Sequence, residues 1–439
     1  MTETLVDVPT SVKTFVFPND TTYLRTYGMT ASSIFEPLYA ELRQRSDWSQ
    51  RKLNEKNSRL FAGNYEICER GSSRRILFKD IEEKEASGVK VKLEAGMSLR
   101  VQSRSGVPPF VLRIAEGTKI KKGKASRIQV EFLPIEAQEF RDQGRLDYIE
   151  GDTYDYCSDE RLSKVASTIL DTHHITNKTN LVTSMASEVG PNGFIPPSYQ
   201  IQFGGWYGPK PATRDGEVWF LKNSVRDRAS GIQLLKTPEE ALRHVEPQHR
   251  YVLQPSLKTP ALLDGRKYDL RFYVSLVHDE ERLFWCLFRT GLLRKCAEPY
   301  VRGSLEPARQ LSNFVPEAAE LESFNRQKYG VFTPKSADYE SVIKQVGEIV
   351  GKLAQSTRFL IGTRRKSRRF HFLSLDFGLQ SDGRLWLFEV NNSPGLRFPH
   401  SNVHTELVEP LFRSFVDDAL EPLIAGKSLG PTDNWSVIA

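Results

Sequence analysis

The stretch LDFGLQSDGRLWLFEVNNSPG, residues 375–395, decides the fold. Two apolar segments flank a turn-forming segment at residues 380–384 that includes an Asp-Gly pair, so the pattern predicts a β-hairpin. Asp376 lies in the first strand, and Glu389 and Asn391 lie two residues apart in the second. Because residues two apart in a strand point to the same face, these three oxygen-bearing side chains are expected to meet across the hairpin.

Two carboxylates and an amide inside otherwise apolar strands would repel one another unless a cation lies between them. Oxygen ligands of this kind suit Mg²⁺, which takes few protein ligands and completes its coordination with phosphate and water. The alternative is a surface hairpin with ordinary acidic residues on its solvated face. The apolar neighbours of Glu389, such as Phe388 and Val390, argue against full solvation. The pattern therefore favours a metal site at Asp376, Glu389 and Asn391.

Length and composition limit the class of protein. With 439 residues and 39% hydrophobic content, the chain can bury a large core in two or three domains. Residues 1–17 contain no apolar targeting segment, and no run of 18 apolar residues occurs, so we expect neither secretion nor a membrane span. The four cysteines form no CxxC pair and are too scattered for a disulfide framework or a zinc site, which favours a reducing, cytoplasmic location.

The net charge of +6 is modest, but basic residues gather in two clusters, at residues 119–127 and 364–369. Basic clusters of this kind are commonly solvated loops. The functional alternative is an acidic partner, either a polyacidic peptide or nucleic acid. Nucleic acid is the weaker alternative, because neither cluster belongs to a recognisable binding module.

The first half of the chain alternates between segments of different character. A short strand is expected at residues 14–17 and a helix at 33–45. Residues 84–140 contain short segments with alternating apolar and polar residues, separated by Gly and Pro turns, which predict a β-rich insertion. Residues 160–187 are expected to be mostly helical.

The second half is predicted to contain antiparallel strands with helices packed against them, the α+β class. The capping box Thr237-Pro238-Glu239-Glu240 is expected to begin a helix. Strands are expected at residues 217–221, 250–254, 269–277 and 283–289, and amphipathic helices at 337–353 and 405–423.

Charged residues at the ends and along one face of these strands are candidates for chemistry. Lys222 ends an apolar strand and opens a polar loop that reaches Gly231, which could be a phosphate-binding loop or a simple connection. Lys267, Asp269 and Arg271 share one strand face, which could be a solvated edge. Because the strand continues with core residues, we expect this face to line a cleft. Arg289, at the end of another apolar strand, adds a second guanidinium.

Taken together, these segments resemble the tubulin–tyrosine ligase family, which includes the tubulin glutamylases and glycylases. The resemblance runs from about residue 217 to the last helix, roughly half of the chain, and is looser in the N-terminal third. The matching pieces are WFLK (219–222), PALLDGRKYDLR (260–271), FRTGLLR (288–294) and Asp376 with EVNNSP (389–394).

The resemblance implies an α+β ATP-grasp fold, with antiparallel sheets, flanking helices and a nucleotide bound in the cleft between subdomains. Residues 1–150 would form an N-terminal domain that includes the β-rich insertion. Residues 151–258 would form the central ATP-grasp subdomain, and residues 259–430 the C-terminal subdomain with the metal site.

The resemblance also implies the cofactors ATP and Mg²⁺ and a role for each candidate residue. Arg271 and Arg289 would hold the γ-phosphate and the acyl-phosphate formed from it, and Lys222 and Arg228 would contact the ATP phosphates, with Gly231 in their loop. Gln254 and Leu257 would border the adenine, and Lys267 and Asp269 would line the nucleotide pocket. Mg²⁺ would be held by Asp376, Glu389 and Asn391, with Asn313 nearby.

Three positions depart from the family pattern. Where the family has two glycines close together in the phosphate loop, this chain has Ala229 at the first position. The family's His-Leu-Thr-Asn segment is replaced by Gln310-Leu311-Ser312-Asn313. The position after Gln254, which is often basic in the family, is Pro255. The metal and arginine residues are all present, which favours an active enzyme.

The implied activity is an ATP-dependent ligase that activates a protein carboxylate as an acyl-phosphate and joins it to a free amino acid. The acceptor is expected to be tubulin or another protein with an acidic tail, and the location cytoplasmic and microtubule-associated. Tyrosine, glutamate and glycine ligases share the quoted residues, so the amino acid stays open. The alternatives are a non-catalytic or degenerate ATP-grasp binding protein and a ligase that acts on a non-tubulin protein.

Overall fold

The computed structural model describes residues 13–16, 35–51, 59–70, 73–82, 98–102, 110–114, 127–133, 146–150, 163–167, 172–213, 216–224, 231–314, 328–357, 368–392, 394, 396 and 401–438. The chain divides into two compact units. Unit 1 comprises Met1–Asp20 and Ser46–Thr168, and unit 2 comprises Thr21–Arg45 and Ile169–Ala439. The domain boundaries expected at residues 150 and 258 stay predictions.

Unit 1 contains four parallel strands in the order β2-β1-β8-β9. They are β1 (Lys13–Val16), β2 (Trp48–Arg51), β8 (Leu146–Glu150) and β9 (Ser163–Ser167). Strand β1 confirms the strand expected near residue 14, whereas the parallel pairing departs from the expected antiparallel arrangement. Strand β9 also shows that the helix expected over residues 160–187 was wrong at its start, because pairing with β8 overrides the local helical pattern.

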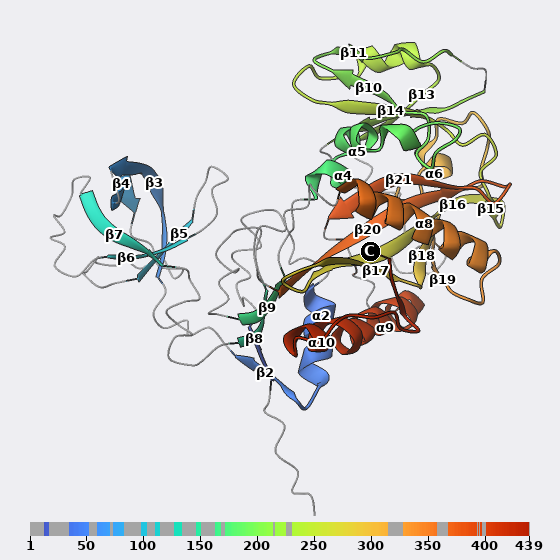
Figure 1. Ribbon diagram of the computed structural model, residues 1–439. Helices are drawn as coiled ribbons and strands as arrows, with labels where there is room; N and C mark the ends of the chain where they lie inside the picture. The colour runs from blue at the N-terminus through green and yellow to red at the C-terminus, as the bar shows by residue number, and fades with distance from the viewer. Residues whose placement is uncertain are drawn as a thin grey trace, which may run out of the picture. The chain divides into compact units, whose positions relative to one another are not determined.

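Unit 1 also contains a closed five-stranded barrel in the order β3-β4-β7-β6-β5 (Figure 1). Its strands are β3 (Arg59–Arg70), β4 (Ser73–Glu82), β5 (Ser98–Gln102), β6 (Phe110–Ile114) and β7 (Arg127–Leu133). Strands β5 and β7 confirm the alternating segments read from the sequence. The barrel begins before residue 84, because β3 closes it by parallel pairing with β5, and closure leaves no unpaired edge.

From residue 172 on, unit 2 contains short helices and then a five-stranded antiparallel sheet in the order β11-β10-β14-β12-β13. The helices are α4 (His173–Thr176) and α5 (Lys178–Ser184), and the strands are β10 (Tyr199–Gln202), β11 (Gly205–Tyr207), β12 (Trp219–Asn223), β13 (Ile232–Leu235) and β14 (Tyr251–Pro255). The helix expected from Thr237 is only a short 3₁₀ helix, η4 (Pro238–Arg243). The Thr237 side chain makes no cap hydrogen bond, and Glu240 instead accepts one from the Lys236 N–H at 3.1 Å.

A larger antiparallel sheet of unit 2 is built around the long strand β16 (Arg266–His278). Strand β20 (Arg368–Leu379) pairs along one side of β16. On the other side, β18 (Gly291–Lys295) pairs with the first half of β16 and β17 (Leu283–Phe288) with the second. Strands β15 (Leu262–Leu263), β19 (Tyr329–Phe332), β21 (Leu385–Asn392) and β22 (Trp435–Val437) complete the sheet. The antiparallel pairing of β20 with β21 confirms the predicted hairpin.

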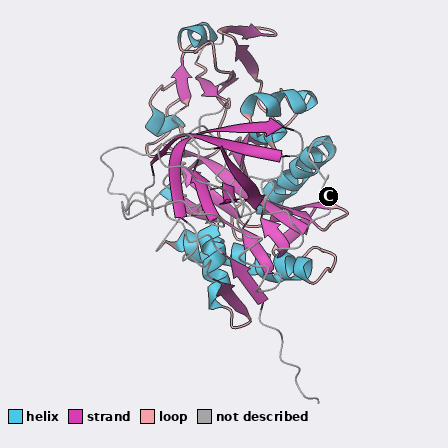
Figure 2. Ribbon diagram, turned by 90° about the vertical axis from the view of Figure 1, so that its left-hand side faces the viewer, coloured by secondary structure: helices cyan, strands magenta, loops and turns pink. Residues whose placement is uncertain are grey.

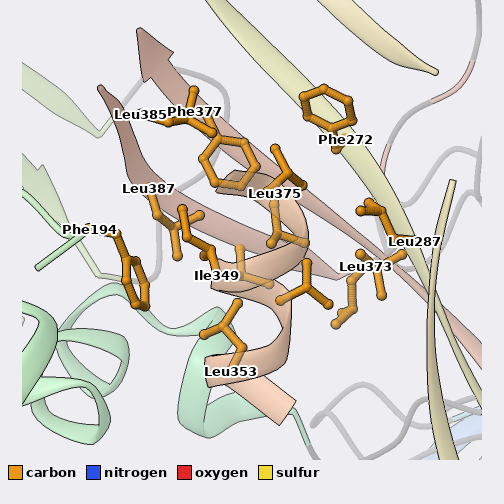
Figure 3. Packing of buried hydrophobic residues seen from close by; sticks show 14 of the residues in the cluster. Phe194, Phe272, Leu287, Ile349, Leu353, Leu373, Leu375, Phe377, Leu385 and Leu387 are labelled. Carbon is orange, nitrogen blue, oxygen red and sulfur yellow. The ribbon is translucent and has the colours of Figure 1, made fainter. Parts of the chain in front are cut away.

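One face of this sheet forms the main core. Alternate residues of β16 and β20, among them Phe272, Leu375 and Phe377, pack against helix α8 (Tyr339–Thr357), which contributes Ile349 and Leu353 (Figure 3). Because side chains alternate along a strand, the charged residues between these apolar positions point to the opposite face. Core packing therefore fixes which face of β16 and β20 carries the candidate site.

Helices cover the strands of unit 2 on the outside (Figure 2). The α-helix α2 (Phe35–Gln44) packs near α9 (Glu409–Phe415), where Arg45 pairs with Asp417 at 2.6 Å. The last helix runs through η5 (His404–Val408), α9, η6 (Val416–Leu420) and α10 (Glu421–Ile424), with two π-helical turns. It confirms the helix expected at residues 405–423. No helix in the described part of the chain is long and apolar enough to span a membrane.

Candidate active site

A pocket in unit 2 collects most of the candidate residues. Residues of both sheets of this unit and of the segment after helix α6 (Pro307–Gln310) line it. Eight of the sequence candidates are among its lining residues: Lys222, Gln254, Leu257, Lys267, Asp269, Asn313, Asp376 and Glu389. The structure therefore brings together residues that the sequence spreads over five strands and their connections.

The other candidates lie as follows. Arg271 and Asn391 adjoin the pocket through hydrogen bonds to Asp376. Gly231 accepts a hydrogen bond from the Asn223 N–H at 2.8 Å, next to the strand end that carries Lys222. Arg289 follows β17 and is not among the described lining residues; its backbone carbonyl accepts from the Tyr339 hydroxyl at 2.9 Å.

Some predicted features lie outside the described residues. They are Arg228 and Ala229 of the phosphate loop, most of the basic cluster at 119–127, and residues 364–367 of the second basic cluster. Of that second cluster, Arg368 pairs with Glu280 at 2.9 Å and Arg369 is buried. Its role as a docking site for an acidic tail stays a prediction.

The hairpin brings three oxygen-bearing side chains together. Asp376 lies directly opposite Glu389 in the β20–β21 register, and a β-bulge follows that pair. The bulge lets Phe388 and Glu389, neighbours in sequence, both line the pocket. The Asn391 amide donates to Asp376 Oδ2 at 3.4 Å and to Glu389 Oε1 at 3.2 Å. The Asn391 amide nitrogen therefore lies within hydrogen-bond distance of both carboxylates.

These side chains fit a hard cation. They offer two carboxylates and one amide oxygen, and turning the Asn391 amide would present its oxygen instead of its nitrogen. Among the described residues there is no group of three or more His, Cys, Asp or Glu suited to a metal. A small ligand set of this kind suits Mg²⁺ bound together with phosphate, and does not suit an all-protein cage.

Two arginines, the buried Arg294 and the partly buried Arg271, hold Asp376. Arg271 forms a two-pronged contact with it, Nε to Oδ1 at 2.6 Å and Nη2 to Oδ2 at 2.7 Å. Arg294 pairs with Asp269 at 2.6 and 3.0 Å and reaches Asp376 Oδ2 at 3.0 Å. Burial alone would raise the pKa of Asp376, but the charges of Arg271 and Arg294 outweigh it and hold that pKa well below its usual range. Asp376 therefore stays ionised.

Sequence reasoning missed two residues of this site. Arg294 belongs to the FRTGLLR segment, which was already quoted for the resemblance and is the signal that could have identified it; the structure places Arg294 opposite Asp269 in the β16–β18 register. Lys178 opens helix α5, and its Nζ lies 3.5 Å from Glu389 Oε2. Its place could not be read from local sequence, because the helix and the hairpin meet only in the folded chain.

Two buried lysines occupy different parts of the pocket. Lys222 donates to Gln254 Oε1 at 2.7 Å and lies 5.1 Å from the centre of the Phe388 ring. Burial lowers the pKa of Lys222 to about 8. Lys267 donates to the backbone carbonyl of Gln310 at 3.2 Å, and burial lowers its pKa as well.

The charge balance of the site is positive. Three carboxylates, Asp269, Asp376 and Glu389, face five cationic side chains: Lys178, Lys222, Lys267, Arg271 and Arg294. Five positive charges less three negative ones leave an excess of two within these described residues. Such an excess in a partly buried pocket attracts a polyanion such as a nucleoside triphosphate.

Gly378 keeps the Phe388 wall of the pocket in place. A Cβ at this position would lie 2.2 Å from Phe388 Cζ and 2.6 Å from Cε2. We expect Gly378→Ala to displace the ring from beneath Lys222 and to lower the free energy of unfolding by about 1–3 kcal/mol. Urea denaturation measures the change. Gly430→Ala is the control, because a Cβ there meets nothing within 4 Å; equal losses in both variants would contradict the packing role.

Comparison with known proteins matches residues 207–426 to the Tubulin-tyrosine ligase family. The match covers half of the chain and includes the whole candidate site except Lys178. The chain belongs to the tubulin-tyrosine ligase family.

Several characterised proteins are similar over the same region at low identity. Tubulin polyglutamylase TTLL5 of Homo sapiens is 23% identical over 235 residues, 48% of this chain and 18% of the relative. The probable alpha-tubulin polyglutamylase Ttll1 of Tetrahymena thermophila is 23% identical, over 46% of this chain and 54% of the relative. Protein polyglycylase TTLL10 of Macaca fascicularis is 25% identical, over 47% and 38%. The matched region spans about half of these relatives' length or less.

Proposed function

We propose that the protein is an ATP- and Mg²⁺-dependent ligase that joins a free amino acid to a carboxylate of an acceptor protein, with an ATP-grasp fold that binds the nucleotide in the pocket. The observation that carries the proposal is the joint placement of Asp376, Glu389 and Arg294 in one positively charged pocket, with Arg271 beside it in contact with Asp376. Carboxylates that suit a metal and guanidiniums that suit phosphate are both needed to transfer a phosphoryl group.

The reaction follows from these charges. An oxygen of the acceptor carboxylate attacks the γ-phosphorus of ATP, the bond to the β-phosphate oxygen breaks, and ADP leaves. The amine of the amino acid then attacks the acyl carbon of the acyl-phosphate, loses a proton and expels phosphate. The first step brings two anions together, and the second develops negative charge on the acyl oxygen and on the departing phosphate, so both require fixed positive charge.

The chain's own residues supply most of that charge. Arg271 and Arg294, which Asp376 and Asp269 hold in two-pronged contacts, would place positive charge beside the transferred phosphoryl group, and Lys222 and Lys178 flank Glu389. Asp376, Glu389 and Asn391 would hold Mg²⁺, which adds positive charge at the phosphate oxygens. Gln254 and Leu257 would border the base, with Asp269 and Asn313 along the pocket wall.

The acceptor and the location follow from the relatives. TTLL5 and Ttll1 are described as tubulin polyglutamylases, and TTLL10 as a protein polyglycylase. We therefore infer an acceptor with an acidic tail, tubulin first, and a cytoplasmic, microtubule-associated location. Glutamate and glycine are the first amino acids to test, followed by tyrosine.

Mass spectrometry of tubulin tails tests this function. The purified protein is incubated with ATP, Mg²⁺, tubulin and one amino acid at a time. We expect the tails to gain the mass of one kind of amino acid residue, and this gain to disappear with Glu389→Gln. Unmodified tails with every amino acid, although ATP binds, would instead support a binding protein or a different acceptor.

The protonation of Lys222 gives a pH-dependent prediction. Its folded-state pKa of about 8 means that the free protein loses this proton as the pH rises through 8. An anionic nucleotide favours the charged form, so binding above pH 8 should take up a proton, and the affinity should fall as the pH rises. Calorimetry in buffers of different ionisation enthalpy measures the uptake.

Lys222→Arg is the control for this prediction, because arginine stays charged throughout the range. We expect the variant to bind without proton uptake. Uptake that persists in Lys222→Arg would assign it to another group, such as Lys328, whose pKa burial also lowers to about 8.

A further inference from the structure

Gln310 presents one unsatisfied acceptor at the pocket. It ends helix α6, is only 3% exposed and belongs to the pocket lining. Its side-chain Nε2 donates to the backbone carbonyl of Val301 at 3.2 Å. A carbonyl can only accept, so this contact fixes which end of the amide is nitrogen. Its Oε1 is buried and has no hydrogen-bond partner among the described residues.

A buried acceptor without a donor is unfavourable, because it has lost its hydrogen bonds to water and has not replaced them. Most buried polar atoms in folded proteins are paired, so an unpaired one that lies beside a pocket suggests a partner on the ligand. The free atom is an oxygen, and the ligand must therefore offer an N–H or O–H at this point.

The register of β12 with β14 indicates which part of a nucleotide reaches Gln310. Phe220 lies opposite Gln254, which would border the base, and Lys222 follows two residues later on the same face, toward the metal residues. Lys267, which donates to the Gln310 backbone carbonyl, lies beside the Phe220 ring. Gln310 is therefore on the base side of Lys222.

The base side of the pocket is apolar and suits a flat ring. Phe220 and Leu311 belong to one buried apolar cluster, and Lys267 Nζ lies 4.9 Å from the centre of the Phe220 ring. Leu311 directly follows Gln310, and both residues line the pocket with Phe220. A nucleobase with an edge N–H would bury its ring there and satisfy the oxygen at the same time.

We propose that Gln310 Oε1 accepts a hydrogen bond from the exocyclic 6-amino group of adenine and is a specificity-determining residue of the nucleotide site. A 6-oxo purine would place a second acceptor against Oε1, and the two oxygens would repel each other. This inference rests on the proposed function, which supplies the nucleotide, and goes beyond it by assigning the selection of the base to a residue at which the chain departs from the family pattern.

Binding of three nucleotides tests the inference. The affinities of ATP, GTP and purine riboside triphosphate, which lacks the 6-amino group, are measured by calorimetry with Mg²⁺ for the full chain. We expect the unaltered protein to bind ATP about 10-fold more tightly than purine riboside triphosphate and about 100-fold more tightly than GTP. In Gln310→Leu, which keeps the size and removes the acceptor, we expect ATP and purine riboside triphosphate to bind within about twofold of each other.

Gln248→Leu is the matched control, because Gln248 is exposed and its amide donates to Glu246 at 2.9 Å. It should keep the full preference for ATP. Equal binding of ATP and purine riboside triphosphate by the unaltered protein would overturn the role of Gln310 while leaving the proposed function intact. This measurement does not depend on the folding of any variant. Failure to bind any of the three nucleotides would overturn the proposed function and, with it, this inference.

Discussion

Arg294→Lys should lower the turnover of the proposed ligase reaction by about 100-fold, the cost of removing one group that stabilises charge in a transition state. Lysine keeps the positive charge but loses the two-pronged geometry with which Arg294 holds Asp269 and reaches Asp376. The measurement is the initial rate of amino acid incorporation into tubulin at saturating ATP.

Arg282→Lys is the matched control for Arg294→Lys, because Arg282 is 62% exposed and its ion pair with Asp279, at 3.8 Å, lies outside the pocket. We expect this variant to retain turnover within about threefold, an effect typical of exposed residues away from a site. Equal losses in the two variants would contradict the site geometry described above. The catalytic role expected for Arg289 stays a prediction.

Asp376→Asn should lower the free energy of unfolding by about 3 kcal/mol, because it leaves two guanidiniums in a largely desolvated site facing a neutral amide. The Asp376 side chain is only 5% exposed, that of Arg294 8% and that of Arg271 15%. Urea denaturation at neutral pH, without nucleotide or metal, measures the loss.

Asp264→Asn provides the comparison for Asp376→Asn. Asp264 is 68% exposed and pairs with Lys295 at 3.0 Å, and asparagine tolerates its left-handed backbone, φ 54°. We expect a change below about 1 kcal/mol, as for other exposed ion pairs. Similar losses in the two variants would show that Asp376 is no more important to folding than a surface carboxylate.

The sequence predicted the parts of the fold that depend on local periodicity. The β20–β21 hairpin and helix α8 follow from alternation and from helical spacing, and both were correct. Alternation along β16 also placed Lys267, Asp269 and Arg271 on one face, away from the Phe272 core. These predictions needed no knowledge of which strands are neighbours.

The features that sequence analysis missed depend on such knowledge. The parallel strand β9 and the barrel closure between β3 and β5 are set by pairing between distant segments. Arg294 faces Asp269 only because β18 pairs with β16 in one particular register, and Lys178 reaches Glu389 only because helix α5 packs near β21. Periodicity in one sequence carries no information on register or packing between elements.

The release of ADP tests the central claim that this pocket activates a carboxylate with ATP. The purified protein is given ATP and Mg²⁺ alone, with tubulin, with an amino acid, and with both. We predict rapid ADP release only when tubulin and one amino acid are both present, and a loss of about 100-fold or more with Glu389→Gln. ADP release that is equally fast without the acceptor, or that survives Glu389→Gln, would contradict the account.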